Sequence, residues 1–130
     1  MKILSIEDDA LNRRVVRDML MVAGVVMDEA DNAKTGLQMI DEMTFDVVLM
    51  DLRMPGMDGL EAISLIRQRD DAKASLPIII ITADAAENLR ETCMAQGADE
   101  LLLKPVAMED LFDAIGQVIA ARATGSTLLV

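Results

Sequence analysis

The feature that most constrains the fold of this chain is a fivefold alternation of short apolar runs with longer amphipathic segments. The apolar runs predict strands at residues 2–6, 25–29, 46–50, 78–81 and 99–103. The segments that follow them carry apolar residues three and four positions apart, and they predict helices at residues 10–23, 33–42, 59–69, 85–96 and 108–122. Such an alternation implies parallel strands joined by crossover helices on both faces of one sheet.

The length of the chain fits a single sheet of this kind. With 130 residues, 52% of them hydrophobic, the chain has the size of one domain and enough apolar residues for a core. We therefore expect an α/β fold, a doubly wound (βα)5 flavodoxin-like three-layer sandwich with parallel strand order 2-1-3-4-5. We assign the domain to residues 1–122 and a C-terminal tail, which contains Gly and Ser, to residues 123–130.

Composition excludes several functions. The chain has no histidine, which excludes His-dependent catalytic triads, His-ligated zinc and a phosphohistidine on this chain. Its single cysteine, Cys93, excludes an internal disulfide. The net charge of −11 and the presence of only two aromatic residues, both Phe, argue against nucleic-acid binding. The apolar runs are too short to cross a membrane and the N-terminus lacks a signal-peptide pattern, so we expect a cytoplasmic protein.

Polar residues follow four of the predicted strands at the point where each strand ends. They are Glu7, Asp8 and Asp9 after the first strand, Asp51 after the third, Thr82 after the fourth and Lys104-Pro105 after the fifth. Ligands of doubly wound sheets bind at this edge. Carboxylates gathered there repel one another unless a cation lies between them, and Mg²⁺ prefers oxygen ligands. Beside such a cation Asp51 can be a nucleophile toward phosphorus, although caps and solvated turns explain each residue taken alone.

In order and spacing these residues resemble the receiver domain of two-component response regulators, over roughly residues 2–121. The segment 49–59, LMDLRMPGMDG, resembles the acceptor loop of that family, in which a strand-end Asp precedes Met-Pro and Asp-Gly. Glu7 and Asp8 resemble its acidic pair, and Thr82 resembles its switch hydroxyl. Lys104-Pro105 resembles its lysine and the following proline, whose bond is often cis in the family.

The resemblance implies a role for each matching residue. Asp51 would be the phosphoacceptor, and Asp8, Asp51 and the backbone carbonyl of Arg53 would bind Mg²⁺, with Glu7 acting through water. The threonine and the lysine would bind the phosphoryl group, and the lysine would pair with Asp51 before phosphorylation. The family takes its phosphoryl group from a sensor histidine kinase or a histidine phosphotransferase. Receivers are not conventional enzymes, but they catalyse their own phosphorylation and dephosphorylation.

Four further positions near the site affect how far the properties of the family carry over to this chain. Leu101 stands where the family usually has an aromatic switch residue, and it is either core packing or part of an apolar docking surface. Arg53 and Asp84, two residues beyond the acceptor and the threonine, carry opposite charges. They can pair across the mouth of the site and hinder water, or they are separately solvated. Ala83 is small and leaves room for the phosphoryl group.

The helix predicted at residues 10–23 carries both an apolar stripe and a basic group. We expect four of its apolar residues to face the core, namely Leu11, Val15, Met19 and Val22. Its three arginines either contact a kinase or form a solvated face, and they are Arg13, Arg14 and Arg17.

Other functions remain as alternatives. A phosphatase of the haloacid-dehalogenase type needs an acid two residues after the nucleophile, where this chain has Arg53, and a flavin site needs a phosphate loop where the chain has three acids. Within the family, the chain signals to an unidentified downstream protein, acts as a phosphate shuttle or sink, or binds a partner as a pseudo-receiver. Met1 and the tail favour a single-domain regulator over an excised receiver, and we expect a monomer or weak homodimer.

Overall fold

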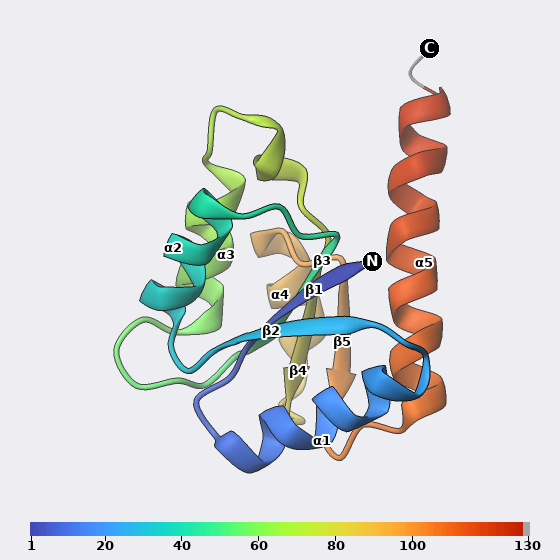
Figure 1. Ribbon diagram of the computed structural model, residues 1–130. Coiled ribbons are helices and arrows are strands. Elements are labelled where there is room, and N and C mark those ends of the chain that lie inside the picture. Colours follow the sequence, from blue (N-terminus) through green and yellow to red (C-terminus); the bar gives the residue numbers. More distant parts are fainter. Residues whose placement is uncertain (129–130) are drawn as a thin grey trace.

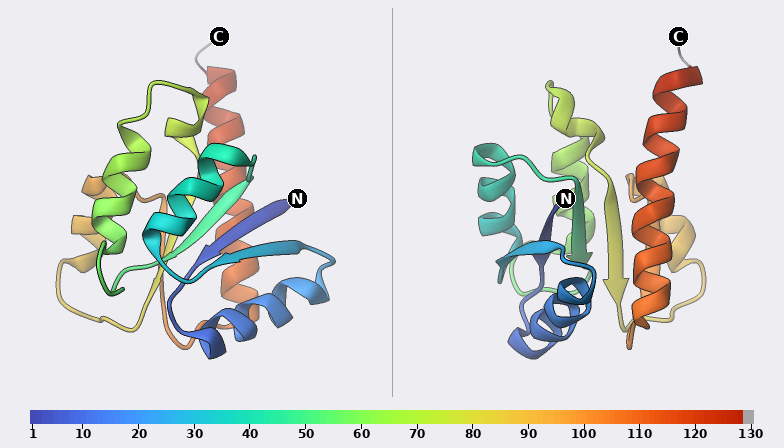
Figure 2. Two further views of the ribbon diagram at one scale, coloured as in Figure 1. Left: turned by 60° about the vertical axis from the view of Figure 1, so that its left-hand side comes forward. Right: turned by 45° about the vertical axis from the view of Figure 1, so that its right-hand side comes forward.

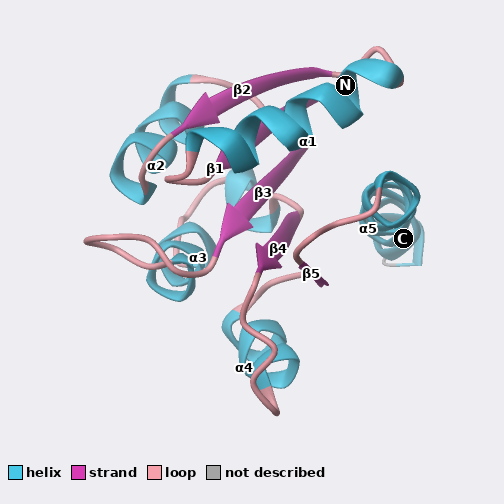
Figure 3. Cartoon of the chain, turned by 90° about the horizontal axis from the view of Figure 1, so that it is seen from below, coloured by secondary structure: helices cyan, strands magenta, loops and turns pink. Residues whose placement is uncertain are grey.

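The computed structural model describes the backbone of residues 1–128 and the side chains of residues 1–122. Five parallel strands form one sheet in the predicted order, β2-β1-β3-β4-β5 (Figures 1 and 3). The strands are β1 (Lys2–Ile6), β2 (Val26–Ala30), β3 (Val47–Asp51), β4 (Ile78–Thr82) and β5 (Glu100–Leu103). The helices are α1 (Ala10–Val22), α2 (Ala33–Glu42), α3 (Gly59–Arg67), α4 (Leu89–Gln96) and α5 (Met108–Leu128), with a 3₁₀ helix, η1 (Ala72–Ser75).

The sheet has a hydrophobic core on each face. The core under α2, α3 and α4 takes Val48 and Met50 from β3, whereas the core under α1 and α5 takes Val47 and Leu49 from the same strand. Figure 2 shows α2 and α3 on one side of the sheet and α5 on the other. All five residues of β3 and of β4 are buried, as the uninterrupted apolar runs predict for strands covered on both faces.

Short polar side chains start three of the helices. Asp9, Asn32 and Asp58 each accept a hydrogen bond from the backbone N–H three residues later, at 3.0, 2.8 and 2.9 Å, and these bonds cap α1, α2 and α3. Each cap satisfies an N–H group that has no partner inside its helix. The caps of α1 and α3 lie close after β1 and β3, so these helices begin beside the carboxyl edge of the sheet.

The buried face of α1 differs from our prediction. Val16 and Leu20 are buried, whereas Leu11 and Val22 of the predicted stripe are 68% and 72% exposed, and Val15 is also exposed. Apolar residues occupy two faces of this helix, and the helical period alone does not decide which of them the sheet covers. Val16 is buried in place of the predicted Val15, and Met19 is the one predicted residue that packs against the core.

Other boundaries also differ. Helix α4 begins at Leu89 instead of residue 85, because the carboxylate of Asp84 accepts a bond from the N–H of Ala86 and Asn88 has a left-handed backbone, with φ of 65°. The predicted loop at 70–75 contains η1. Helix α5 continues to Leu128, past residue 122 where we expected it to end, and residues 129–130 of the assigned tail lie outside the described residues. Among the described helices, none is long and apolar enough to cross a membrane.

Candidate active site

Strand register brings together the acidic residues at the carboxyl ends of β1 and β3. Ile6 pairs with Met50, so Glu7 and Asp51 stand level at the carboxyl edge of the sheet. Both are buried, at 6% and 7% exposure, whereas Asp8 is exposed at the rim. One carboxylate oxygen from each of these three acids lies within 4.8 Å of the others. The structure thus places the predicted acidic group in one cluster.

Lys104 supplies a positive charge to this cluster. Its Nζ donates to Oε1 of Glu7 at 2.6 Å and lies 3.5 Å from Oδ1 of Asp51. The contact with Asp51 that the resemblance implied is therefore present, but Glu7 is the nearer partner. Burial lowers the pKa of Lys104, but its hydrogen bond to Glu7 and the charge of Asp51 outweigh that effect and raise the pKa above its ordinary value. The Lys104-Pro105 peptide bond is cis, and Pro105 is exposed.

Thr82 closes β4 beside the cluster, level with Leu103 of β5. Its side chain is buried, and its Oγ1 accepts a hydrogen bond from the N–H of Asp84 at 3.1 Å. That bond uses the hydroxyl as an acceptor and leaves its proton available to another acceptor. The hydroxyl is therefore linked to the loop between β4 and α4.

An ion pair joins the two loops beside the cluster. Nη2 of Arg53, after β3, donates to Oδ2 of Asp84, after β4, so of the two alternatives that the sequence left open the structure shows the pair and not separately solvated side chains. The hydrogen bond from Arg53 lowers the pKa of Asp84. The side chain of Arg53 is 71% exposed and that of Asp84 is 22% exposed, so the pair stands at the surface. Ala83, beside Asp84, is exposed and adds no bulk to this opening.

Gly59 holds the acceptor loop against α3. Its N–H donates to the carbonyl oxygen of Leu52 at 2.9 Å. A Cβ atom at this position would lie 2.6 Å from the carbonyl oxygen of Asp51 and 3.0 Å from Cα of Leu52. The glycine of the Asp-Gly pair is therefore required by a close approach of backbone to backbone. The motif is visible in the sequence, whereas this backbone contact is not.

Leu101 stands on β5, where it pairs with Ile80. It is partly buried and packs against the core under α4, as the simple packing alternative requires. It also lines a groove of about 450 Å³ with Leu89 and Leu103. The position thus combines core packing with part of an apolar surface.

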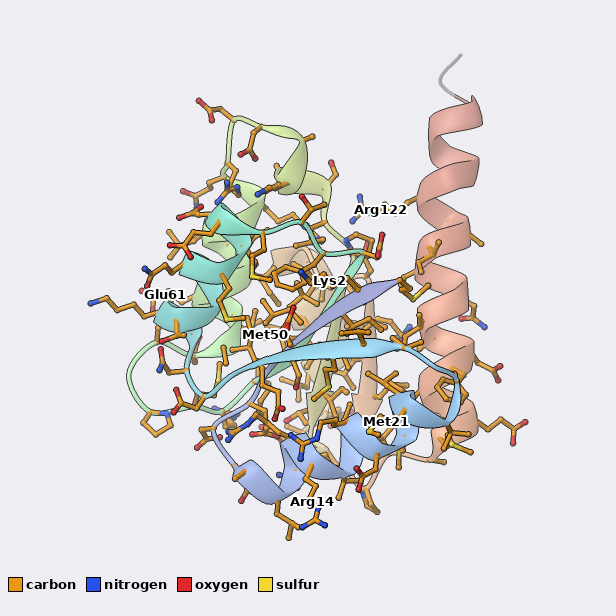
Figure 4. The ribbon with its side chains drawn as sticks, in the orientation of Figure 1. Lys2, Arg14, Met21, Met50, Glu61 and Arg122 are labelled. Atoms are coloured by element: carbon orange, nitrogen blue, oxygen red, sulfur yellow. The ribbon has the colours of Figure 1, made fainter. Side chains whose placement is uncertain are left out.

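The arginines of α1 are not one solvated face. Arg13 and Arg17 both donate to the carboxylate of Glu29 on β2, and Arg13 also donates to the backbone carbonyl of Glu7. Arg14 points away from the body of the molecule, with its side chain 71% exposed (Figure 4). No sequence pattern reports a backbone carbonyl as an acceptor, so the contact of Arg13 with Glu7 was missed.

The donor set of the cluster fits Mg²⁺. Its three carboxylates offer hard oxygen ligands to a small divalent cation. Among the side chains of residues 1–122, only the Lys104 ammonium offsets their negative charge within hydrogen-bonding reach. A cavity of about 150 Å³ adjoins Asp51 and Lys104 under α1, lined mainly by apolar side chains such as Val16 and Leu49. The site therefore has surplus negative charge beside an apolar wall.

A doubly wound sheet with acids, a hydroxyl and a lysine at its carboxyl edge places the chain in the class of α/β proteins that bind a ligand at that edge. The chain matches the response regulator receiver domain over residues 3–116, and it belongs to that family. It is thus homologous to the phosphoacceptor domains of two-component systems, which implies phosphoryl-transfer partners.

Curated relatives include both regulators and kinases. The chain is 33% identical over 125 residues to the response regulator protein FleR of Pseudomonas aeruginosa, covering 96% of this chain and 26% of FleR. It is 34% identical over 109 residues to the sensor histidine kinase RcsC of Escherichia coli, covering 84% of this chain and 11% of RcsC. The chain thus spans only a minor part of these relatives.

Solved structures show the same fold. The receiver domain of sensor histidine kinase PA1611 from Pseudomonas aeruginosa is 29% identical, with a TM-score of 0.83 and coverage of 92% of this chain and 97% of that one. That structure has a magnesium ion coordinated in its active site cleft. The chemotaxis protein CheY4 of Vibrio cholerae is 27% identical, with a TM-score of 0.82 and coverage of 90% and 97%.

Proposed function

We propose that this chain accepts a phosphoryl group on Asp51, with Mg²⁺ bound beside it, and signals through phosphorylation-dependent contact with another protein. The observation that carries the proposal is the position of Asp51. It is a buried carboxylate, 3.5 Å from the Lys104 ammonium and within 4.8 Å of carboxylate oxygens of Glu7 and Asp8. A structural ion pair needs only one of these acids for the lysine, and Glu7 already holds it at 2.6 Å.

Each residue of the cluster has a part in this proposal. Asp8, Asp51 and the backbone carbonyl of Arg53 would hold Mg²⁺, and Glu7 would act on it through water. The cation would neutralise negative charge that the phosphoryl group brings to an already acidic site. Lys104 would move from its carboxylate partners to a phosphoryl oxygen, and the Thr82 hydroxyl would donate to another.

The transfer step is a displacement at phosphorus. A carboxylate oxygen of Asp51 forms a bond to phosphorus while the bond from phosphorus to the imidazole nitrogen of a donor phosphohistidine breaks. The electron pair of the broken bond stays on that nitrogen, and the donor histidine takes up a proton from water. Because residues 1–130 include no histidine, the donor histidine lies outside these residues, on a sensor histidine kinase or a histidine phosphotransferase.

Intact mass spectrometry after incubation with Mg²⁺ and a small phosphodonor tests the proposal. We expect one added phosphoryl group on the natural chain, none on Asp51→Asn, and one on the control Asp113→Asn, which removes an exposed carboxylate of α5. An unmodified natural chain, or an adduct that persists in Asp51→Asn, would contradict the assignment. A chain that stays unmodified but binds a partner would instead be a pseudo-receiver.

A pull-down with and without a phosphate mimic separates a signalling switch from a phosphate sink. A switch has at least one protein whose binding depends on the mimic, whereas a sink has none. The groove beside Leu101 and the exposed Leu103 and Met108 provide an apolar surface for such a contact. Substitution of Leu103 by Ser should therefore weaken mimic-dependent capture and leave phosphorylation of Asp51 unchanged.

A further inference from the structure

The backbone of Glu7 is held at both of its polar groups. Its N–H donates to the carbonyl oxygen of Ala30, at the end of β2, at 3.0 Å. Its carbonyl oxygen accepts from Nη1 of Arg13 at 2.7 Å. Arg13 lies in the first turn of α1, so its guanidinium extends back to the segment of three acids that joins β1 to α1. The peptide bond between Glu7 and Asp8 is thereby attached to a helix.

The Arg13 guanidinium is itself fixed by a second partner. Its Nε donates to Oε1 of Glu29 on β2 at 3.2 Å, and the side chain is only 18% exposed. The other oxygen of Glu29 accepts from Nη1 of Arg17 at 2.5 Å. Hydrogen bonds with ionised partners are shorter and stronger than neutral ones. Glu29 therefore orients Arg13, and Arg13 in turn holds the carbonyl of Glu7.

This attachment opposes a repulsion inside the acidic cluster. The cluster places three carboxylates within 4.8 Å, and its nearest ammonium, Lys104, is bonded to Glu7. Rotation of the peptide between Glu7 and Asp8 would let two of these carboxylates move apart. The bond from Arg13 resists that rotation because the guanidinium would lose its acceptor. The acids are thereby kept close together in the absence of a cation.

We propose that Arg13 is a positioning residue for the cation site, because it fixes the peptide that carries Glu7 and Asp8. This proposal rests on the proposed function, because the bound cation has a role only if Asp51 accepts a phosphoryl group. The positioning is a property of the metal-free protein, and it is measured without any phosphoryl transfer.

Arg17 is a matched control on the same helix. It has the same charge and the same carboxylate partner, and among the described residues its hydrogen bond is to Glu29 and not to Glu7. Loss of either arginine makes the region more negative by one charge, and this change alone strengthens attraction for a cation. Loss of positioning weakens cation binding. The two causes therefore have opposite signs.

The experiment compares Arg13→Met and Arg17→Met by titrating each metal-free, ¹⁵N-labelled protein with MgCl₂ and following backbone amide signals. We expect Arg13→Met to bind Mg²⁺ about tenfold more weakly than the natural chain, as for other residues that orient metal ligands. Arg17→Met should bind it as tightly or slightly more tightly. Arg13→Lys, which keeps the charge but replaces the guanidinium fork with a single ammonium nitrogen, should recover part of the affinity.

A second readout does not use the metal. The amide nitrogen of Asp8 belongs to the same peptide group as the Glu7 carbonyl, so its chemical shift in metal-free protein should change in Arg13→Met and stay in place in Arg17→Met. Equal or tighter Mg²⁺ binding by Arg13→Met, with an unchanged Asp8 signal, would overturn the proposal. If Arg13→Met does not fold, Arg13→Lys against Arg17→Lys makes the same comparison. Failure of Asp51 to accept a phosphoryl group would remove the proposed function and leave this result intact.

Discussion

The two edges of the sheet differ in how their charged side chains are paired. At the amino edge, Arg67 donates to three backbone carbonyls and to Asp99, and Arg122 donates to the other oxygen of Asp99. Lys73 donates to carbonyls at the end of α2, including that of Ile40 at 2.7 Å. The labelled Arg122 lies at this edge in Figure 4. Each of these cations has its acceptors within the described part of the chain.

At the carboxyl edge, charges are gathered without being balanced. Three carboxylates share one ammonium there, and two of the carboxylates are buried. The cations of the amino edge are fully paired, whereas the acidic cluster of the carboxyl edge keeps an excess of negative charge. A folded protein tolerates the repulsion between these carboxylates because the rest of the structure supplies enough stability. Removal of a cation at the amino edge should therefore destabilise the protein, whereas removal of an acid from the cluster at the carboxyl edge should stabilise it.

The largest loss of stability should come from Arg67→Met at the amino edge. The variant leaves Asp99 and the carbonyls of Ala74, Leu76 and Gly97 without this donor, and we expect a loss of about 3 kcal/mol in the free energy of unfolding. Urea unfolding measures it. Arg122→Met, which removes one partly exposed bond to Asp99, should cost less than about 1 kcal/mol. Equal losses in the two variants would contradict the comparison, as would altered Mg²⁺ binding by Arg67→Met.

Gly59→Ala should be the next most destabilising change. The added Cβ meets backbone atoms of the acceptor loop, so the loop must shift, at a cost of about 2 kcal/mol. Gly116→Ala is the control, because a Cβ there meets nothing within 4 Å, and it should stabilise α5 by about 0.5–1 kcal/mol. Both are measured by urea unfolding. Equal stability of the Gly59 variant and the natural chain would show that the loop adjusts without strain.

Asp51→Asn should make the metal-free protein more stable, by about 1 kcal/mol, because it removes one of the mutually repelling carboxylates while Lys104 keeps Glu7. Thermal unfolding with and without Mg²⁺ tests this. Mg²⁺ should stabilise the natural chain, because a ligand that binds the folded state stabilises it. The difference in stability between Asp51→Asn and the natural chain should therefore become smaller. A variant less stable than the natural chain in both conditions would show that Asp51 is a structural ion-pair partner.

The contribution of Lys104 to stability should be lost at alkaline pH. Its pKa in the folded protein is raised by Glu7 and Asp51, so this contribution is complete below the ordinary lysine pKa of about 10.4 and is lost as pH rises through the folded value. The difference in unfolding free energy between the natural chain and Lys104→Met should therefore shrink above this pH. Urea unfolding on either side of it is the measurement, and a constant difference would contradict the assigned pairing.

The smallest effects on stability should come from the exposed pair of Arg53 and Asp84. If the pair hinders water at the mouth of the site, Arg53→Ala and Asp84→Ala should each change the dephosphorylation rate a few-fold. The double variant should change it by less than the product of the two. Strict additivity of the logarithms of the rates would mean that the two side chains act separately.

Much of the fold could be predicted because its signals are local. The apolar runs located all five strands, and the rule for doubly wound sheets placed Asp51, Thr82 and Lys104 at one edge. The buried face of α1 could not be predicted, because apolar residues lie on two of its sides and tertiary packing chooses between them. The contact of Arg13 with the Glu7 carbonyl could not be predicted either, since it depends on the path of the backbone after β1.

Helix α4 has a consequence for how the molecule opens. Within α4, all of whose residues the structure describes, Cys93 alone is buried, and Asn88 begins the helix without a side-chain cap. Opening this helix exposes little apolar surface, so its amides should exchange with solvent by local unfolding while the sheet stays folded. The helix is joined to Thr82 by the loop that also carries Asp84. We therefore expect the opening of α4 to need less free energy than the unfolding of the sheet, so that this helix can change conformation while the global fold persists.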